Sequence, residues 1–409
     1  MKFFFPDSQD QVSPSYDFVA EEYSPYRVRQ RDDLYGHEVL VTPPYAGMLV
    51  SKAIVDGSVS GSGKYSEAQR SRLYRYGVHR FFRLPAGLEA LGDCGAFNYV
   101  NEPEPPYTVV EVADFYEGCG FDSGISVDHV VLAYDRNIGL LDAPYQWSAR
   151  RLISLRYAEA FLAECERRGR PFEPVGAAQG WDPTSYADSV RQLQEMGYRR
   201  IALGGMVPLK TRDILGALVA VAAVRAPGVS LHLLGVTRVN SMNEFRALGV
   251  DSFDSTSPFR QAFMDDRDNF HTMDGHYTAM RIPQVDANSA LKRRILSGEI
   301  DQPTAVLAER ACLAAVRAVT KRRATVDAAL AALAEYESLL KLKKTYIPEY
   351  ERTLEDRPWA SCRCRLCRDH RVEIAIFRGT ERNKRRGFHN LSVLGGQVRA
   401  LAVQQEEVA

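Results

Sequence analysis

The stretch that decides the fold is Gly249-Val-Asp-Ser-Phe-Asp254-Ser-Thr-Ser-Pro258. A short apolar and aromatic run leads into Asp254, and hydroxyl residues and a proline follow, so a strand ends here. A carboxylate at such a position either faces a cleft or caps the next turn. The stretch alone fits both roles, and the remainder of the chain favours the cleft.

Short β-prone runs alternate with helical stretches along most of the chain. This alternation is typical of a parallel barrel or a doubly wound sheet. In a barrel the chemistry gathers at the C-terminal ends of the strands. Polar or glycine residues directly follow five of the expected strands: Asp93, Asp135, Gln179, Gly204-Gly205 and Asp254. The sequence therefore predicts an α/β fold with a (β/α)8 TIM-type barrel.

Composition changes along the chain predict five segments. They are an irregular lead-in (1–36), the barrel (37–283), a helical insertion rich in Ala, Leu, Lys, Arg and Glu (284–350), a cysteine-rich basic subdomain (351–390) and a C-terminal helix that completes the barrel (391–409). Within the barrel, the apolar run Val130–Tyr134 is expected to be a strand buried on both faces that ends at Asp135. Tyr277–Ile282 is expected to be its last strand.

Charge and cysteine usage narrow the class of protein. The formal net charge is zero, so a nucleic-acid partner would have to bind through a local basic patch. The seven cysteines, three of them crowded into one short segment, indicate a reducing compartment with thiolate metal ligands, hence the cytoplasm. Apolar runs are too short to cross a membrane, so we expect no membrane partner.

A metal site is predicted from Cys362, Cys364, Cys367 and His389. Three thiolates and an imidazole are the tetrahedral set that Zn²⁺ prefers, and four protein ligands leave no open position, so the zinc would be structural. His370 competes with His389 for the fourth position, but it follows Cys367 so closely that it leaves little room for a loop.

The same segment is rich in arginine. A rigid lobe of this kind is a good phosphate-binding surface, although an ordinary solvated charged face gives the same pattern. The residues expected to contact nucleic acid are Arg378, Arg382, Lys384, Arg385 and Arg386.

The two strand-end carboxylates Asp93 and Asp254 allow a specific chemistry. One carboxylate can attack a sugar anomeric carbon to form a covalent intermediate, while a second carboxyl group moves protons. The pair alone is weak evidence.

Taken together, the motifs resemble the tRNA-guanine transglycosylase family, over roughly residues 37–283 and 356–404. The resemblance rests on six elements in family order: Gly92-Asp93-Cys-Gly-Ala-Phe97-Asn98, Val131-Leu-Ala-Tyr-Asp135, Ala178-Gln179-Gly180, Ala202-Leu-Gly204-Gly205-Met206, Asp251-Ser-Phe-Asp254, and the three cysteines with His389-Asn-Leu. It implies a barrel with an inserted zinc subdomain that replaces guanine in a polynucleotide with a 7-deazaguanine.

The resemblance also implies residue roles. Asp254 would be the nucleophile and Asp93 the general acid/base. The base pocket would be lined by Asp135, Gln179, Gly204, Gly205, Met206 and Phe97.

Departures from the family pattern favour one branch. Asn98, Trp181 and Met206 replace a glutamine, a glycine and a leucine, and the helical insertion has no recognised counterpart in the tRNA enzymes. These features resemble the DpdA-like branch, which places 7-deazaguanines such as 7-cyano-7-deazaguanine into DNA. DNA is therefore favoured over tRNA as the partner, and helper proteins of a DNA-modification system and a homodimer stay open.

Three alternatives remain at this point. The first is a tRNA-guanine transglycosylase of the queuosine or archaeosine pathways. The second is a non-catalytic nucleic-acid-binding subunit of such an enzyme, which would have no use for two strand-end carboxylates. The third is an unrelated barrel glycosidase, which would leave the basic metal lobe unexplained.

Overall fold

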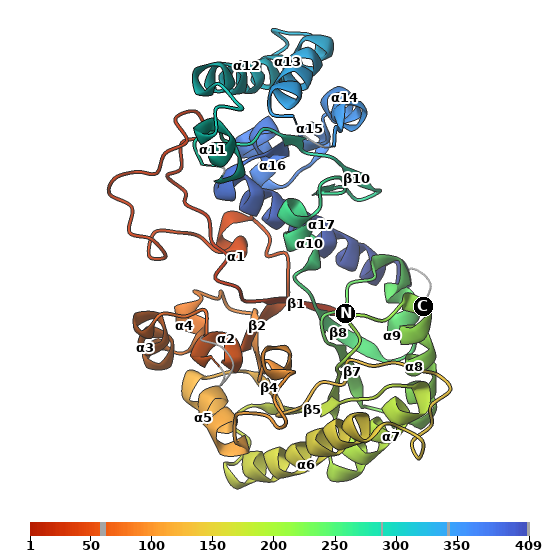
Figure 1. The fold of residues 1–409 in the computed structure, drawn as a ribbon. Helices are drawn as coiled ribbons and strands as arrows, with labels where there is room; N and C mark the ends of the chain where they lie inside the picture. The colour runs from red at the N-terminus through yellow and green to blue at the C-terminus, as the bar shows by residue number, and fades with distance from the viewer. Residues whose placement is uncertain (58–62, 288, 342–343, 407–409) are drawn as a thin grey trace. The chain divides into compact units, whose positions relative to one another are not determined.

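The computed structural model describes residues 1–57, 63–287, 289–341 and 344–406, and it divides the chain into two compact units (Figure 1). The first, called here the barrel unit, consists of Met1–Gln9, Tyr45–Thr256 and the chain from Val398 onward. The second unit consists of Asp10–Pro44 and Ser257–Gln397.

The barrel unit is a closed barrel of eight parallel strands in chain order, which confirms the predicted fold class. The strands are β1 (Lys2–Pro6), β2 (Gly47–Ser51), β3 (Glu89–Asp93), β4 (Ser123–Ile125), β5 (Glu173–Ala178), β6 (Arg200–Leu203), β7 (Ser230–Leu233) and β8 (Val250–Asp254). The barrel closes where β1 pairs with β8 in a register that sets Phe4 opposite Asp254. Buried side chains fill its interior: Phe4, Leu49, Leu91, Ile125, Val175, Ala177 and Ala202.

Helices follow the strands, as parallel pairing requires. They are α2 (Lys52–Asp56), α3 (Glu67–Tyr76), α4 (Val78–Phe81), η1 (Ala96–Tyr99), α5 (Val109–Cys119), α6 (Tyr145–Arg167), α7 (Pro183–Met196), α8 (Thr211–Val224), η2 (Val239–Ser241) and α9 (Met242–Ala247). Local sequence signals mark where these helices begin. Asp182, for example, caps α7 by accepting from the backbone amides of Thr184 and Ser185, and Pro183 occupies the first turn.

The structure differs from the predicted barrel at three places. The lead-in was expected to be irregular, but its first residues form the barrel strand β1, in which Phe3, Phe4 and Phe5 are buried. The fourth strand is Ser123–Ile125, and Val130–Tyr134 has no regular secondary structure. The expected last strand, Tyr277–Ile282, lies in the second unit, and its residues Met280–Arg281 form β11, which pairs with β12 (Ile376–Phe377).

The second unit is mostly helical. Its elements are α1 (Gly36–Val39), α10 (Ser257–Met264), α11 (Ser289–Leu296), α12 (Gln302–Thr320), α13 (Val326–Leu339), α14 (Ile347–Asp356), α15 (Pro358–Ser361), α16 (Arg365–His370), η3 (Arg371–Ala375), and the two-residue strands β9 (Phe270–His271) and β10 (His276–Tyr277) with β11 and β12. The final helix, α17, runs from Gly379 to Glu406 and therefore begins well before residue 391.

One buried core joins the insertion helices to the cysteine segment. It includes Val316 of α12, Leu333 of α13, Tyr350 of α14, Trp359 and Cys367. The insertion and the metal subdomain, predicted as separate segments, thus share a core. Across the described part of the chain, every helix is too short or too polar to cross a membrane.

Candidate active site and metal cluster

Asp254 ends β8 and is nearly buried, with 6% of its surface exposed. Its Oδ1 accepts two hydrogen bonds, from Nε2 of His232 at 3.2 Å and from the backbone N–H of Gly235 at 3.0 Å. Sequence reasoning missed His232, which lies inside β7 among apolar residues and reads there as a core side chain. The carboxylate at the end of β8 is therefore held from the neighbouring strand.

Asp93 ends β3 in the same barrel and is partly buried. Its Oδ2 accepts a hydrogen bond of 2.7 Å from the hydroxyl of Ser51, the last residue of β2. Burial raises the pKa of Asp93, and the charge of Asp254 raises it further. The structure thus brings the two predicted catalytic carboxylates into electrostatic contact and favours the protonated form of Asp93.

A third carboxylate, Asp128, joins this group and was not predicted. It is 2% exposed, and Nε2 of Gln179 donates to its Oδ2 at 2.5 Å, while the thiol of Cys94 donates to its Oδ1 at 3.0 Å. Burial, followed by the charge of Asp93, raises the pKa of Asp128 to about 7. The sequence signal was the short run Gly124-Ile-Ser-Val-Asp128, in which an aspartate closely follows β4.

Asp135, the predicted base-reading residue, lies ten residues beyond the end of β4. It lies in a turn, where its Oδ1 accepts from the backbone N–H of Asn137 at 2.9 Å. Its own backbone N–H donates to the carbonyl of Trp181 at 2.9 Å. Because β4 ends at Ile125, the carboxylate nearest the end of this strand is that of Asp128, and the role of Asp135 stays a prediction.

Gln179 and the two glycines after β6 form a close-packed wall. Gln179 is 1% exposed, and its Oε1 accepts from the backbone N–H of Val131 at 3.1 Å. A Cβ on Gly204 would lie 2.1 Å from Nε2 of Gln179, and one on Gly205 would lie 2.4 Å from the carbonyl oxygen of Val131. Gly205 also has a positive φ of 72°. Glycine is required at both positions so that the backbone can approach this amide.

The remaining predicted pocket residues differ in exposure. Met206 is completely buried, whereas Phe97, on η1, is 50% exposed. Trp181, which replaces a glycine of the family pattern, is buried, and its indole N–H donates to the carbonyl of Ile138 at 2.9 Å. Its ring packs against that of Trp147 from α6. The substitution therefore anchors the loop that follows Asp135.

The arginines predicted to contact nucleic acid are mostly buried, and this prediction is wrong for four of the five residues. Arg378, Arg382, Arg385 and Arg386 are between 0% and 4% exposed. Arg378 pairs with Glu21 and Glu309, Arg382 with Glu21 and Glu373, and Arg385 with Glu381. Arg386 donates to the backbone carbonyls of Ala262, Ile374 and Ile376. Lys384 retains some exposure and pairs with Asp10.

The physical reason for this burial is that the carboxylates arrive from distant sequence. Glu21 belongs to the N-terminal segment and Glu309 to α12, so a local count of charges in the cysteine segment does not include them. Buried arginines need such partners, because an unpaired charge is costly to desolvate. These side chains hold the second unit together and are not a phosphate-binding surface.

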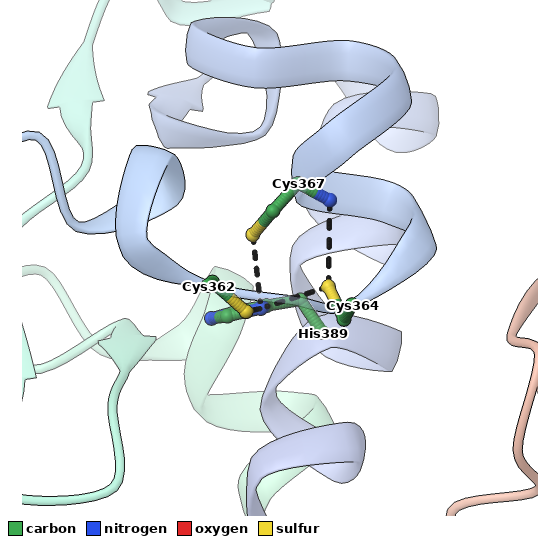
Figure 2. Close-up of side chains that lie close together, drawn as sticks. All are labelled: Cys362, Cys364, Cys367 and His389. Carbon is green, nitrogen blue, oxygen red and sulfur yellow. Dashed lines mark hydrogen bonds between the residues drawn. The ribbon is translucent and has the colours of Figure 1, made fainter.

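The predicted metal ligands do come together. The ligand atoms of Cys362, Cys364, Cys367 and His389 all lie within 4.8 Å of one another (Figure 2). Nδ1 of His389 is 3.7, 3.5 and 3.4 Å from the three sulfur atoms in that order. A zinc ion with ordinary bond lengths and tetrahedral angles would set sulfur and nitrogen about 3.6 Å apart, so this cluster could hold a metal ion.

The surroundings of the cluster favour the same conclusion. His389 Nε2 lies 2.8 Å from the carbonyl oxygen of His271, which leaves Nδ1 to face the sulfurs as a ligand. The competing residue His370 instead places its ring against that of Phe18. Of the two histidines, His389 is therefore the one that lies in the cluster that could hold a metal ion.

Chemically, the barrel end combines a fixed carboxylate, a carboxyl group of raised pKa and a preorganised polar wall. A carboxylate of this kind can act as a nucleophile, and a carboxyl group of raised pKa can move protons. Asp128 is oriented by Gln179 and Cys94 and can accept hydrogen bonds from a ligand edge. Such an arrangement fits the transfer of a glycosyl group from or to a nitrogen heterocycle.

A DNA-guanine transglycosylase from Salmonella montevideo is 45% identical over 414 residues, which cover 100% of this chain and 99% of that protein. A search against models of protein families gave no match.

Proposed function

Because the chain belongs to the family of that transglycosylase, the DNA-acting branch of the tRNA-guanine transglycosylase-like enzymes, we propose that it exchanges guanine in DNA for a 7-deazaguanine. The observation that carries this proposal is the pairing of Asp254 with Asp93 at the strand ends of one barrel. We favour 7-cyano-7-deazaguanine as the incoming base, following the resemblance of the sequence to the DpdA-like branch.

The first displacement uses Asp254. With the target nucleotide extruded from the stack, a lone pair of the Asp254 carboxylate forms a bond to C1′ of the sugar. The bond from C1′ to N9 of guanine breaks, and its electron pair stays on N9. Asp93, whose raised pKa favours the protonated form, supplies the proton to the departing base.

The second displacement reverses these roles. Asp93, now a carboxylate, takes the N9 proton of the incoming 7-deazaguanine. The freed electron pair attacks C1′, and the bond to Asp254 breaks with its pair returning to the carboxylate. Two displacements at one carbon retain the configuration, so the modified nucleotide has the same anomeric form as the original.

Base recognition falls to the wall beside the two carboxylates. A carboxylate has about four lone-pair sites, and the bonds from Gln179 and Cys94 use only two of those on Asp128. The others can accept from N1–H and the exocyclic amine that guanine and 7-deazaguanine share. The half-exposed ring of Phe97 offers a stacking face, and Gly204 and Gly205 let the base approach the backbone.

The metal cluster has no part in these steps. Cys362, Cys364, Cys367 and His389 would hold a structural Zn²⁺ that stabilises the second unit. We place the protein in the cytoplasm, since its seven cysteines, all within the described residues, form no disulfides and three of them are candidate metal ligands. Helper proteins that open the duplex, and a homodimer, are compatible with this function and belong to the proposal.

Covalent capture tests the proposal. The protein is incubated with guanine-containing DNA and, separately, with tRNA, and denaturing gels are scored for protein–nucleic-acid adducts. We expect an adduct on DNA that is absent from Asp254→Asn. An adduct on tRNA alone would instead make the protein a tRNA enzyme. Turnover by Asp254→Asn close to that of the wild type would refute the mechanism.

A further inference from the structure

His232 is a fully buried histidine in the strand next to the proposed nucleophile. Its Nε2 lies 3.2 Å from Oδ1 of Asp254, and its Nδ1 lies 3.0 Å from the hydroxyl oxygen of Ser252 on β8. The edge of the ring packs against Phe4 of β1, at a centroid distance of 5.9 Å and an angle of 67°. Contacts from β8 and β1 therefore fix the ring.

The protonation pattern follows from the chemistry of the partners. An ionised carboxylate can only accept hydrogen bonds, so Nε2 of His232 must carry the proton and donate it to Asp254. The hydroxyl of Ser252 donates its single proton to Oδ1 of Asp251 at 2.9 Å, so its oxygen faces Nδ1 of His232 as an acceptor. The chain from Asp251 through Ser252 thus orients His232 toward the nucleophile.

Both donors bind the same oxygen of Asp254. In the described part of the chain, the hydrogen bonds from His232 and from the Gly235 N–H end on Oδ1. This arrangement leaves Oδ2 to form the bond to C1′. In the covalent intermediate Oδ1 becomes the carbonyl oxygen of an ester, and the two donors remain on it.

We propose that His232 is a positioning residue that makes Asp254 a good leaving group in the second displacement; this inference rests on the proposed function. When N9 of the incoming base attacks C1′, the electron pair of the breaking bond returns to Oδ2, and negative charge spreads onto Oδ1. A hydrogen bond to a carboxylate is stronger than one to an ester carbonyl. The donation from His232 therefore strengthens as the ester breaks and lowers the barrier to discharge.

The same reasoning gives a different effect on the first displacement. There the free carboxylate loses charge as the bond to C1′ forms, so the hydrogen bond weakens along the reaction. Loss of the donor should slow the formation of the adduct less than its discharge. A residue that merely supports the fold would slow both steps alike.

The test follows discharge of a preformed adduct. Each protein is loaded on guanine-containing DNA without an incoming base, 7-cyano-7-deazaguanine is then added, and the adduct is followed over time by quenched denaturing gels. We expect His232→Phe and His232→Leu, which lack the donor, to discharge about 10- to 100-fold more slowly than the wild type. His232→Gln, whose amide N–H can replace Nε2–H, should stay within about threefold. His79→Phe alters a partly exposed histidine of the same unit and should have no effect.

Every outcome decides the matter. Wild-type discharge by His232→Phe and His232→Leu, or slow discharge by His232→Gln equal to theirs, would overturn the role of the donor. If neither apolar variant forms an adduct while His232→Gln does, the donor acts mainly on the first displacement, and the proposal is overturned. If all three fail while the wild type succeeds, the proposal falls. Absence of an adduct from the wild type would instead refute the proposed function.

Discussion

Asp128 is a single residue whose surroundings make stability depend on pH. Burial raises its pKa from 3.8 to about 7, so between these values the folded state holds a proton that the unfolded state has lost. The free energy of unfolding therefore falls as pH rises through this window, by up to about 1.4 kcal/mol per pH unit. Below about pH 4 the penalty is absent, and above about pH 7 it is complete.

Asp128→Asn removes this titration. We expect the variant to gain stability relative to the wild type as the pH is raised from 5 to 8, measured as the difference between their urea unfolding free energies. Asp135→Asn is the matched control, because an asparagine keeps the acceptor for the Asn137 amide and the position is partly exposed. A difference between Asp128→Asn and the wild type that is the same at both pH values would contradict the assignment.

At the scale of elements, strand ends were predicted well where the strand is regular and its backbone groups are hydrogen-bonded to neighbouring strands. Asp93, Gln179 and Asp254 follow true barrel strands. The failure at Val130–Tyr134 has a physical cause, because a loop can carry the same apolar run as a buried strand; here only Val130 and Val131 are buried, and Leu132 is exposed. Its backbone amides are satisfied by side chains: that of His129 donates to Ser154 and that of Val131 to Gln179. Such partners come from distant helices and loops, which a local pattern does not reveal.

Strand β1 was missed for a different reason. Phe3, Phe4 and Phe5 form a short run that ends at a proline, and a long irregular segment follows it. Nothing local shows that this run pairs with β8, which lies about 250 residues later. Closure of a barrel is a long-range property, and only the count of strands could have indicated that one was missing.

Helix α17 allows a direct test of the corrected role of the arginines. Arg386 is fully buried and donates to backbone carbonyls from α10 and the segment before β12, so Arg386→Met leaves these acceptors unsatisfied. We expect it to lower the free energy of unfolding by about 2–4 kcal/mol. Arg363→Met, in an exposed arginine of the same basic segment, should change it by less than about 0.5 kcal/mol.

The salt dependence of DNA binding separates the two roles of Arg386. A residue that contacts a phosphate contributes close to one unit to the slope of log K against log salt concentration. The folded fraction of Arg386→Met should keep the wild-type slope, measured by titration at several salt concentrations. A slope reduced by about one unit would restore the predicted phosphate contact.

At the scale of the whole molecule, the chain divides its tasks between two units. The barrel unit contains all the residues assigned to base exchange, and the second unit contains the metal cluster in a core shared with α12, α13 and α14. Because Cys367 lies in that core and Cys362 and Cys364 pack against it, a bound ion would support the insertion helices as well as its own loop. The helical insertion therefore belongs to the core that a bound ion would stabilise.

Removal of the metal should destabilise the second unit selectively. We expect one zinc ion per wild-type chain by elemental analysis, its loss from Cys364→Ser, and its retention in His370→Ala, since His370 lies outside the cluster. Chelation should lower the melting temperature by on the order of 10 °C. Hydrogen exchange should then accelerate in α15, α16 and η3, while β5 and β6 of the barrel stay protected. Equal acceleration in both units, or unchanged zinc in Cys364→Ser, would contradict this division, because a metal that supports only the second core has no direct contact through which to loosen barrel strands.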